Sequence, residues 1–261
     1  MVAQNLVVAP FQLAHAPNAN CRRDGARSGT IRIMPAIAVV GDRDPSYLTH
    51  RELDAALALM PEGVEARWVA TDGPDASRLE RFDALWIVPG TPYRDDRPVF
   101  AAIERARTDG IPILGTCGGF QHMVVEFARN AAGITEAAHA ETAPGAAVHA
   151  VSSLACSLEG EVRQVTTAPG TRVAELCGPG PFAGFHWCNY GVEPAVLDQL
   201  VAAGLVVSAT APDAGVEAVE LPDHPFYAAT LFQPQVGSSE TGILHPLIGA
   251  LVEAAAGVRS A

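Results

Sequence analysis

The stretch Ile111–Gly119 reads IPILGTCGG, and it decides the fold expected for this chain. A short apolar strand runs directly into a cysteine bracketed by glycines, and a helical pattern continues from there to about Asn130. This arrangement of glycines around a nucleophile is typical of a sharp turn between a strand and a helix. Such a turn lifts the side chain of Cys117 clear of the sheet. It also aims the Gly118 amide at the atoms that the cysteine attacks.

The position of Cys117 at the start of a helix favours a thiolate, because the amino end of a helix stabilises negative charge. An oxyanion hole needs a second donor besides the Gly118 N–H. We expect it at Gly90 or Thr91, which follow an apolar strand, because neighbouring parallel strands end at the same edge of a sheet. The alternative is a buried structural cysteine beside a glycine-rich turn. The two glycines and the preceding strand favour the nucleophile.

Apolar runs alternate with helical patterns on the amino-terminal side of this turn. Strands are expected at residues 36–41, 64–69 and 84–88, and helices at residues 49–60 and 98–108. Thr49 and Glu52 form the pattern of a capping box for the first helix. This alternation predicts a single α/β domain with a mainly parallel central sheet and helices on both faces.

The second half of the chain carries weaker signals. Residues 146–190 are rich in glycine and short β-like runs, which indicate small hairpins at the sheet edge. Beyond them we expect a helix at residues 193–203, strands at residues 205–208, 216–221 and 227–232, and a last helix at residues 245–255.

Composition limits the domain count and the kinds of partner. The chain has 261 residues and a formal net charge of −12. These values fit one α/β domain and argue against a nucleic acid or an anionic membrane surface as partner. No apolar run approaches the roughly 18–20 residues of a membrane helix.

Regular patterning begins at Met34. We therefore expect Met34 to be the natural start and residues 1–33 to be a disordered or mis-assigned extension. Residues 34–261 would then form the domain.

The five cysteines include no C-x-x-C spacing. An odd number without this spacing argues against a disulfide framework or a zinc site, and we expect no metal and no cofactor. A reducing cytoplasm is the compartment that fits best.

Two runs of sequence resemble one protein family. Gly115–Asn130, GTCGGFQHMVVEFARN, is similar to the segment around the nucleophile in the glutaminase domain of CTP synthases. Glu220–Gln235, ELPDHPFYAATLFQPQ, and the HPL at His245–Leu247 resemble the terminal segment of the same domain. The resemblance covers about residues 36–256. It implies the class I glutamine amidotransferase fold and a cytoplasmic cysteine enzyme. No GxxxxGK[ST] phosphate-binding loop occurs, so we do not expect the chain alone to make CTP.

The catalytic histidine and glutamate of that family lie in an F-H-P-E motif, which the resemblance places at Phe232–Gln235. Here the motif reads FQPQ. The amide of Gln233 is not basic near neutrality, and Gln235 carries no charge with which to orient an imidazolium. We therefore expect a degenerate triad in which Cys117 lacks its usual base.

The substrate pocket implied by the resemblance is half retained. Asn189, just before Tyr190, takes the place of the family's arginine, so a bidentate clamp on the glutamine carboxylate is lost. Glu141 matches the glutamate expected near the substrate ammonium, and Gln121 matches a glutamine of the family.

Three histidines are candidates for a replacement base: His50, His122 and His186. Each of them alone is more commonly a surface or packing histidine. We prefer His50, because residues of the first helix border the sheet edge in this fold. A thiolate stabilised only by the helix amino end and the oxyanion donors is the other possibility.

The sequence leaves three functions open. The preferred one is a cysteine-dependent hydrolase or amidotransferase, which forms a thioester or thioimidate at Cys117 with a small amino-acid-like amide, ester or nitrile. The second is a catalytically silent binding or regulatory module of the same fold. The third is a true glutaminase that supplies ammonia to a synthetase partner. A homo-oligomer is also left open, and we expect no measurable turnover of free glutamine.

Overall fold

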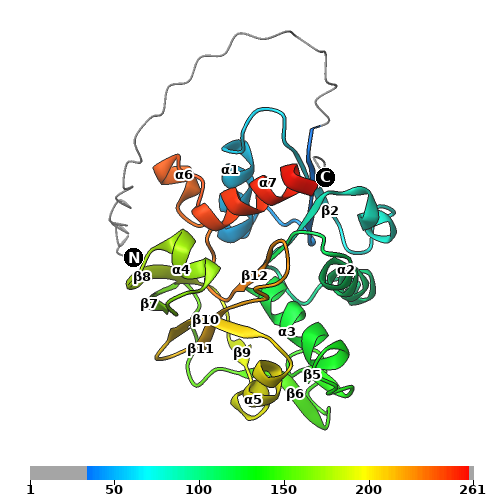
Figure 1. Cartoon of the computed structure of the whole chain (residues 1–261), viewed down its shortest axis with the longest axis vertical. Helices are drawn as coiled ribbons and strands as arrows, with labels where there is room; N and C mark the ends of the chain where they lie inside the picture. Colours follow the sequence, from blue (N-terminus) through cyan, green and yellow to red (C-terminus); the bar gives the residue numbers. More distant parts are fainter. Residues whose placement is uncertain (1–33, 259–261) are drawn as a thin grey trace.

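A nine-stranded sheet forms the centre of the structure (Figure 1). The computed structural model describes residues 34–258, so the extension expected at residues 1–33 lies outside the described residues. The strand order is β2-β1-β3-β4-β12-β11-β10-β7-β8. The first five strands in this order are parallel: β2 Glu65–Val69, β1 Ala36–Val40, β3 Ala84–Ile87, β4 Ile113–Thr116 and β12 Tyr227–Thr230.

The rest of the sheet is antiparallel, and a small second sheet lies apart from it. The antiparallel strands are β11 Gly215–Glu220, β10 Val206–Ala211, β7 Glu161–Thr167 and β8 Pro181–His186. The second sheet contains β5 Ala137–His139, β6 Val148–Ser153 and β9 Tyr190–Val192. Of the hairpins expected at residues 146–190, β7 and β8 form one at the sheet edge, whereas β6 belongs to the second sheet.

Helices cover both faces of the parallel strands, which confirms the expected α/β fold. The covering helices are α1 Leu48–Ala58, α2 Asp96–Asp109, α3 Gly118–Asn130 and α7 Pro246–Val258. Alternate residues of β1 show the division. Ala38 and Val40 pack in the cluster that contains α2 and α3, whereas Ile37 and Val39 pack in the cluster that contains α1 and α7. Strands buried on both faces need continuous apolar runs, and this explains the sequence pattern of β1.

Shorter helices complete the described chain. They are the 3-10 helix Ala76–Arg81, α4 Arg172–Cys177, α5 Pro194–Ala202 and α6 Ser238–Thr241. The sequence analysis did not predict α4. Its first turn is capped by the Thr171 hydroxyl, which accepts a hydrogen bond from the Ala174 N–H at 3.2 Å.

The capping box expected at Thr49 and Glu52 is wrong. Helix α1 follows Tyr47, and no side chain caps it. The Glu52 carboxylate instead accepts hydrogen bonds from the N–H groups of Gly237 and Ser239, at 3.0 and 3.1 Å. Glu52 therefore ties α1 to the amino end of α6, a contact between segments that are far apart in the sequence.

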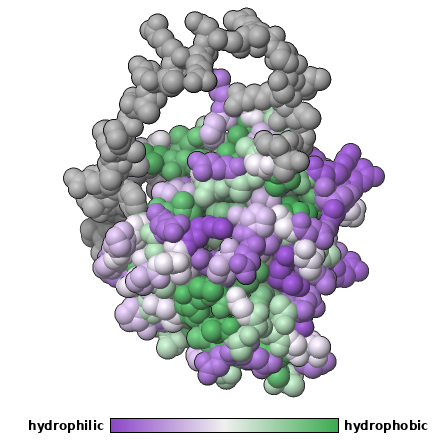
Figure 2. Space-filling view, in the orientation of Figure 1, coloured by the Kyte–Doolittle hydropathy of each residue, from purple (hydrophilic) through white to green (hydrophobic). Residues whose placement is uncertain are grey.

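The surface mixes polar and apolar residues. On the face shown in Figure 2, hydrophilic residues cover much of the molecule, with apolar residues interspersed. Within residues 34–258, every helix is too short or too polar to traverse a bilayer.

Candidate active site

Cys117 has a strained backbone conformation between β4 and α3. Its φ is 52° and its ψ is −106°, and no other non-glycine residue within residues 34–258 has a positive φ. Such a conformation costs about 1–3 kcal/mol and persists only where surrounding contacts fix it. Here the Cys117 N–H donates to the Thr230 carbonyl of β12 at 2.8 Å, and the Cys117 carbonyl accepts from the Gln121 N–H at 3.0 Å. The sharp strand–turn–helix junction expected from the sequence is therefore present.

Two glycines let the start of α3 pack closely against the end of β3 and the loop after it. A Cβ on Gly119 would lie 2.0 Å from the carbonyl oxygen of Ile87. A Cβ on Gly118 would lie 2.4 Å from Cγ2 of Thr91. Only glycine fits at such distances. The turn that carries Cys117 and the loop expected to supply the second oxyanion donor are thus in contact.

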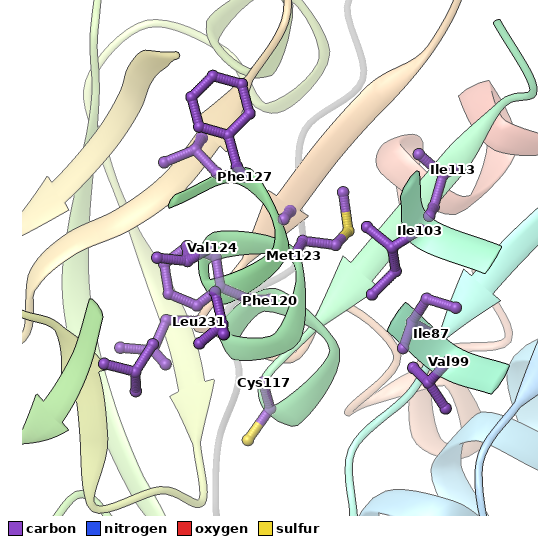
Figure 3. Packing of buried hydrophobic residues seen from close by; sticks show 14 of the residues in the cluster. Ile87, Val99, Ile103, Ile113, Cys117, Phe120, Met123, Val124, Phe127 and Leu231 are labelled. Atoms are coloured by element: carbon purple, nitrogen blue, oxygen red, sulfur yellow. The ribbon is translucent and has the colours of Figure 1, made fainter. Parts of the chain in front are cut away.

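The sulfur of Cys117 points away from the labelled apolar side chains around α3 (Figure 3). Cys117 lines a cavity of about 620 Å³. Its side chain is only 6% exposed, and its Sγ lies 3.5 Å from the carbonyl oxygen of Trp187. This orientation differs from that of a cysteine buried only for packing, and it leaves the sulfur at the wall of the cavity.

Residues from distant parts of the chain meet around this cavity. The predicted site residues that line it are Gly90, Thr91, Cys117, Gln121, Glu141, Asn189, Tyr190 and Gln233. Other lining residues, to which the sequence analysis gave no role, include Tyr47, Arg51, Glu159, Trp187 and Cys188. Tyr47 and Trp187 are about half exposed, at 51% and 50%, so the cavity reaches the protein surface.

His50 does not line the cavity, so its position does not support the expectation that it replaces the missing base. Its side chain is fully buried. Nδ1 accepts a hydrogen bond from the Asp44 N–H at 2.9 Å, and Nε2 donates to the Pro89 carbonyl at 2.9 Å. A neutral imidazole with both nitrogens occupied has no free lone pair with which to take a proton from a thiol. His50 instead joins the loop before α1 to the loop after β3.

His122 is buried and also stays out of the cavity. Its Nδ1 lies 2.9 Å from the Gly118 carbonyl oxygen, and its Nε2 lies 3.1 Å from Oδ1 of Asp96. Both partners accept hydrogen bonds, so the ring ties the first turn of α3 to the start of α2. A replacement base at His122 is therefore not supported.

His186 forms a buried contact with Glu217 behind the cavity wall. Its Nε2 lies 2.9 Å from each carboxylate oxygen of Glu217, and both side chains have zero exposure. Its Nδ1 has no hydrogen-bond partner among the described residues. None of the described histidines lines the cavity, so a replacement base at His50, His122 or His186 stays a prediction without support from the geometry.

Residues 89–235, more than half of the chain, match the sequence model of the family described as Peptidase C26. The chain belongs to the peptidase C26 family. This family is of the class I glutamine amidotransferase type, so the resemblance inferred from the nucleophile turn is confirmed.

Curated relatives of this peptidase C26 chain include CTP synthases. The enzyme from Acidothermus cellulolyticus is 38% identical over 244 residues, which cover 84% of this chain and 44% of the relative. The enzyme from Archaeoglobus fulgidus is 34% identical over 248 residues, which cover 85% of this chain and 45% of the relative. The chain thus spans less than half of the length of these relatives.

Two solved structures share the fold. The glutaminase domain of Trypanosoma brucei CTPS with bound acivicin has a TM-score of 0.66 and 23% identity, covering 85% of this chain and 94% of that chain. A glutamine amidotransferase from Thermotoga maritima has a TM-score of 0.54 and 14% identity, covering 85% of this chain and 98% of that chain. The described domain is a glutaminase-like α/β domain related to the glutaminase part of CTP synthases.

In this peptidase C26 domain, the side chains of Gln233 and Gln235 bind each other. Nε2 of Gln235 donates to Oε1 of Gln233 at 2.9 Å, and the two residues are 2% and 0% exposed. The Gln233 N–H donates to the Phe185 carbonyl at 2.8 Å, which fixes the loop after β12 against β8. Nε2 of Gln233 and Oε1 of Gln235 have no partner among the described residues. Gln233 thus lines the cavity as a neutral amide.

Gln121 is held by two buried neighbours. Its Nε2 donates to the Tyr190 carbonyl at 2.8 Å, and its Oε1 lies 3.0 Å from Nε2 of His139. Burial lowers the pKa of His139 to about 4, so its imidazole is neutral at physiological pH and donates to Gln121. The sequence analysis assigned no function to His139. His139 lies next to Gln121 because α3 packs against β5 of the second sheet. The sequence does not show this packing.

Acidic groups dominate the charged part of the cavity wall. Nδ2 of Asn189 donates to Oε1 of Glu159 at 2.7 Å, where the resemblance implies an arginine in relatives. Burial raises the pKa of the Glu141 carboxyl, against smaller opposing effects of His122 and of a hydrogen bond with Thr91. Arg51 also lines the cavity, but its Nη1 already donates to the carbonyls of Pro45 and Ser46. A substrate carboxylate therefore finds no preformed clamp near Asn189.

Cys188 lies next to Cys117 in the cavity wall. The two thiols share a hydrogen bond. This bond raises the pKa of the Cys188 thiol, and burial and the charges of Cys117 and Glu217 raise it further. Cys188 therefore keeps its proton at neutral pH. No local sequence pattern pointed to it, apart from its position directly before Asn189.

Proposed function

We propose that this chain is a Cys117-dependent hydrolase or amidotransferase that acts on a small amide-like substrate through a thioester-type intermediate. The observation that carries the proposal is the strained cysteine at the amino end of α3, whose sulfur lies at the wall of a cavity of about 620 Å³. Strain at a non-glycine residue is characteristic of functional sites.

The reaction would begin with attack of Cys117 Sγ on the substrate carbonyl carbon. The carbonyl electrons move to oxygen, and the Gly118 N–H with a second donor at Gly90 or Thr91 stabilises the resulting oxyanion. Collapse of this intermediate expels the amine or alcohol and leaves a thioester on Cys117. Attack by water then releases an acid, whereas attack by an acceptor amine completes an amidotransfer.

Proton transfer limits this reaction, because no histidine of residues 34–258 lines the cavity. Negative charge on Cys117 depends on the amino end of α3, and the leaving group takes its proton from solvent. We therefore expect slow turnover. Esters and activated amides, whose leaving groups need little protonation, should react much faster than simple amides.

The charges of the cavity support a substrate with an ammonium group and no free carboxylate. Glu141 and Glu159 line the cavity, and Glu159 binds Asn189. We propose that Glu141 binds the ammonium group, whereas Gln121 and Tyr190 shape the wall beside it. Free glutamine would lack a clamp for its carboxylate. We place the protein in the cytoplasm, where Cys117 would stay reduced.

The second candidate is a binding or regulatory module without turnover. The neutral Gln233–Gln235 pair favours it, since these residues occupy the positions of the family's charged base and orienting group. Acivicin, which is bound in the Trypanosoma brucei structure, is a suitable probe of binding. A rise of the melting temperature with acivicin would show that the cavity still takes such a ligand.

Glycyl aryl esters with leaving groups of graded pKa test the first proposal. They carry an ammonium group and no carboxylate, and the release of the phenol is followed by absorbance. We expect a glycyl adduct on Cys117 in the intact mass, a rate that increases as the leaving-group pKa falls, and loss of both in Cys117→Ala. Cys156→Ala is the matched control, because Cys156 is exposed.

Each other result has a defined meaning. Ligand-induced stabilisation without an acyl adduct would favour the binding module. Glutamine hydrolysis that disappears in Cys117→Ala would favour a true glutaminase, and a synthetase partner for the ammonia would then be sought. Rapid carboxymethylation of Cys117 by iodoacetamide below about pH 7, where an ordinary thiol is mostly protonated, would support the enzyme.

A further inference from the structure

We propose that Cys117 and Cys188 form a hydroperoxide-sensitive dithiol, in which Cys117 is oxidised first and Cys188 closes a reversible disulfide with it. This redox chemistry goes beyond the proposed acyl transfer and does not depend on any turnover of an amide or ester.

The position of the two cysteines at one cavity wall carries the proposal. Cys117 ends the turn after β4, and Cys188 follows β8, yet both line the same cavity. Sγ of Cys117 lies 3.5 Å from the carbonyl oxygen of Trp187, the residue bonded to Cys188. The raised pKa of Cys188, to which Cys117 contributes most, agrees with this proximity. Disulfide formation needs the two sulfurs close together, and the fold already supplies this proximity.

The surroundings assign different roles to the two sulfurs. Cys117 stands in the strained turn at the amino end of α3, beside the Gly118 N–H, and its sulfur lies at the cavity wall. The hydrogen bond to Cys117 raises the pKa of Cys188, which therefore keeps its proton. Cys117 is thus the first sulfur to react, and Cys188 is the resolving thiol.

The other described cysteines lie outside this contact. Cys177 is 5% exposed and packs with Val165 and Phe232. Burial raises its pKa to about 12. Cys156 is exposed. Neither lines the cavity, so within residues 34–258 only Cys117 and Cys188 are placed to react together there.

The chemistry balances with a hydroperoxide as the oxidant. The Cys117 thiolate attacks the outer peroxide oxygen, the O–O bond breaks, and the leaving alkoxide or hydroxide takes a proton to give an alcohol or water. Cys117 is then a sulfenic acid. The Cys188 sulfur attacks Sγ of Cys117, the S–O bond breaks, and water leaves with the thiol proton. In total, two thiols lose two electrons and the peroxide gains them.

The disulfide would have a defined effect on the site. It removes the attacking sulfur and links the turn after β4 to the segment after β8 across the cavity wall. Acyl transfer, if the protein performs it, would stop until a thiol reductant restores both cysteines.

Peptide mapping of the full chain after mild treatment with hydrogen peroxide tests the proposal. Chymotrypsin separates Cys177 from Cys188 by cleavage after Phe182 and Phe185, so the linked partner can be identified. We expect a Cys117–Cys188 peptide, an intact mass lower by two hydrogens, and reversal of both by dithiothreitol. Cys156→Ser should behave as the wild type.

Removal of the resolving thiol provides the second measurement. In Cys188→Ser, oxidation should stop at a Cys117 sulfenic acid that dimedone traps, and further peroxide should give sulfinic acid that dithiothreitol does not reverse. The wild-type map decides the question alone if this variant does not fold. The proposal would be overturned by irreversible oxidation of wild-type Cys117 without a linked peptide. Identical oxidation products in Cys188→Ser and wild type would also overturn it.

Discussion

Gly119 approaches the carbonyl oxygen of Ile87 so closely that a Cβ on this glycine would lie 2.0 Å from it. The contact places the first turn of α3 directly against the end of β3. It therefore sets where the Gly118 N–H and the sulfur of Cys117 lie relative to the loop at Gly90 and Thr91. The site depends on a backbone approach that only glycine allows.

Gly119→Ala should destabilise the domain by about 1–3 kcal/mol, because the added methyl group overlaps a backbone atom that cannot move away cheaply. Urea unfolding measures the change. Gly249→Ala is the matched control, since Gly249 also lies in a helix and a Cβ there would meet nothing within 4 Å. This control should be stabilised by up to ~1 kcal/mol through higher helix propensity. Equal effects of both substitutions would contradict the packing argument.

Cys117→Gly should be more stable than Cys117→Ala by about 1 kcal/mol, because glycine adopts the positive φ of 52° without strain. Chemical unfolding of the two variants gives the difference. At the exposed Cys156 the same comparison should reverse its sign, since glycine there only adds freedom to the unfolded chain. A more stable alanine variant at position 117 would show that the turn stores no strain.

The double substitution Gln233→His and Gln235→Glu should accelerate acylation of Cys117 by about 10²-fold, because it restores a base and its orienting carboxylate. Stopped-flow measurements with a glycyl aryl ester give the rate. Gln235→Glu alone is the control. This substitution buries an unpaired carboxylate at a position with zero exposure, so it should lower stability without raising the rate. No acceleration in a folded double variant would place the defect elsewhere in the cavity.

Arg107→Ala should cost about 3–5 kcal/mol, because it leaves the carboxylate of Glu126 buried without its partner. Arg107 and Glu126 form an ion pair at 2.8 Å, in which the glutamate side chain has zero exposure. The control is Arg105→Ala, whose pair with Asp109 is exposed and should be worth at most ~1 kcal/mol. Similar losses in both variants would argue against a special role of the buried pair.

Burial lowers the pKa of His245 to about 4, and His139 should make a similar contribution to the loss of stability on acidification. Burial lowers the folded pKa of His139 to about 4, below the value of about 6.5 in an unfolded chain. The unfolded state therefore binds the proton first, and the contribution of His139 is complete above about pH 6.5 and is lost as the pH falls toward 4. The slope is at most about 1.4 kcal/mol per pH unit.

His139→Gln should flatten this part of the pH profile, since a neutral amide can still bind Gln121 and does not titrate. Unfolding free energies between about pH 4 and pH 7 provide the test. His149→Gln, in the neighbouring strand β6, is the control. An unchanged slope in His139→Gln would assign the acid sensitivity to other groups.

The E-F-A-R-N run of α3 shows how much a sequence motif alone can explain. From the sequence it indicated only a resemblance to glutaminases. In the structure, Glu126 binds Arg107 and the side-chain amide of Asn130, and Arg129 donates to the Ala137 carbonyl of β5. The motif therefore anchors α3 to α2 and to the second sheet. None of its residues lines the cavity.

The sequence by itself determined the order of the strands and α-helices up to α3, the turn at Cys117 and the approximate places of β10, β11 and β12, but not β5 or α4. These features depend on local patterns, because apolar runs encode buried strands and glycines encode tight turns. Only the tertiary structure decided which side chains surround the sulfur. In the sheet order β8 lies at the edge, five strands from β4, yet its Phe185 carbonyl accepts a hydrogen bond from the Gln233 N–H after β12. The segment after β8 thereby reaches the turn after β4, where the Trp187 carbonyl lies 3.5 Å from Sγ of Cys117 although 70 residues separate the two. The tertiary structure also gives both ring nitrogens of His50 hydrogen-bond partners, the Asp44 N–H and the Pro89 carbonyl. Contacts of this kind depend on how distant segments pack against one another, and no local run of residues encodes that packing.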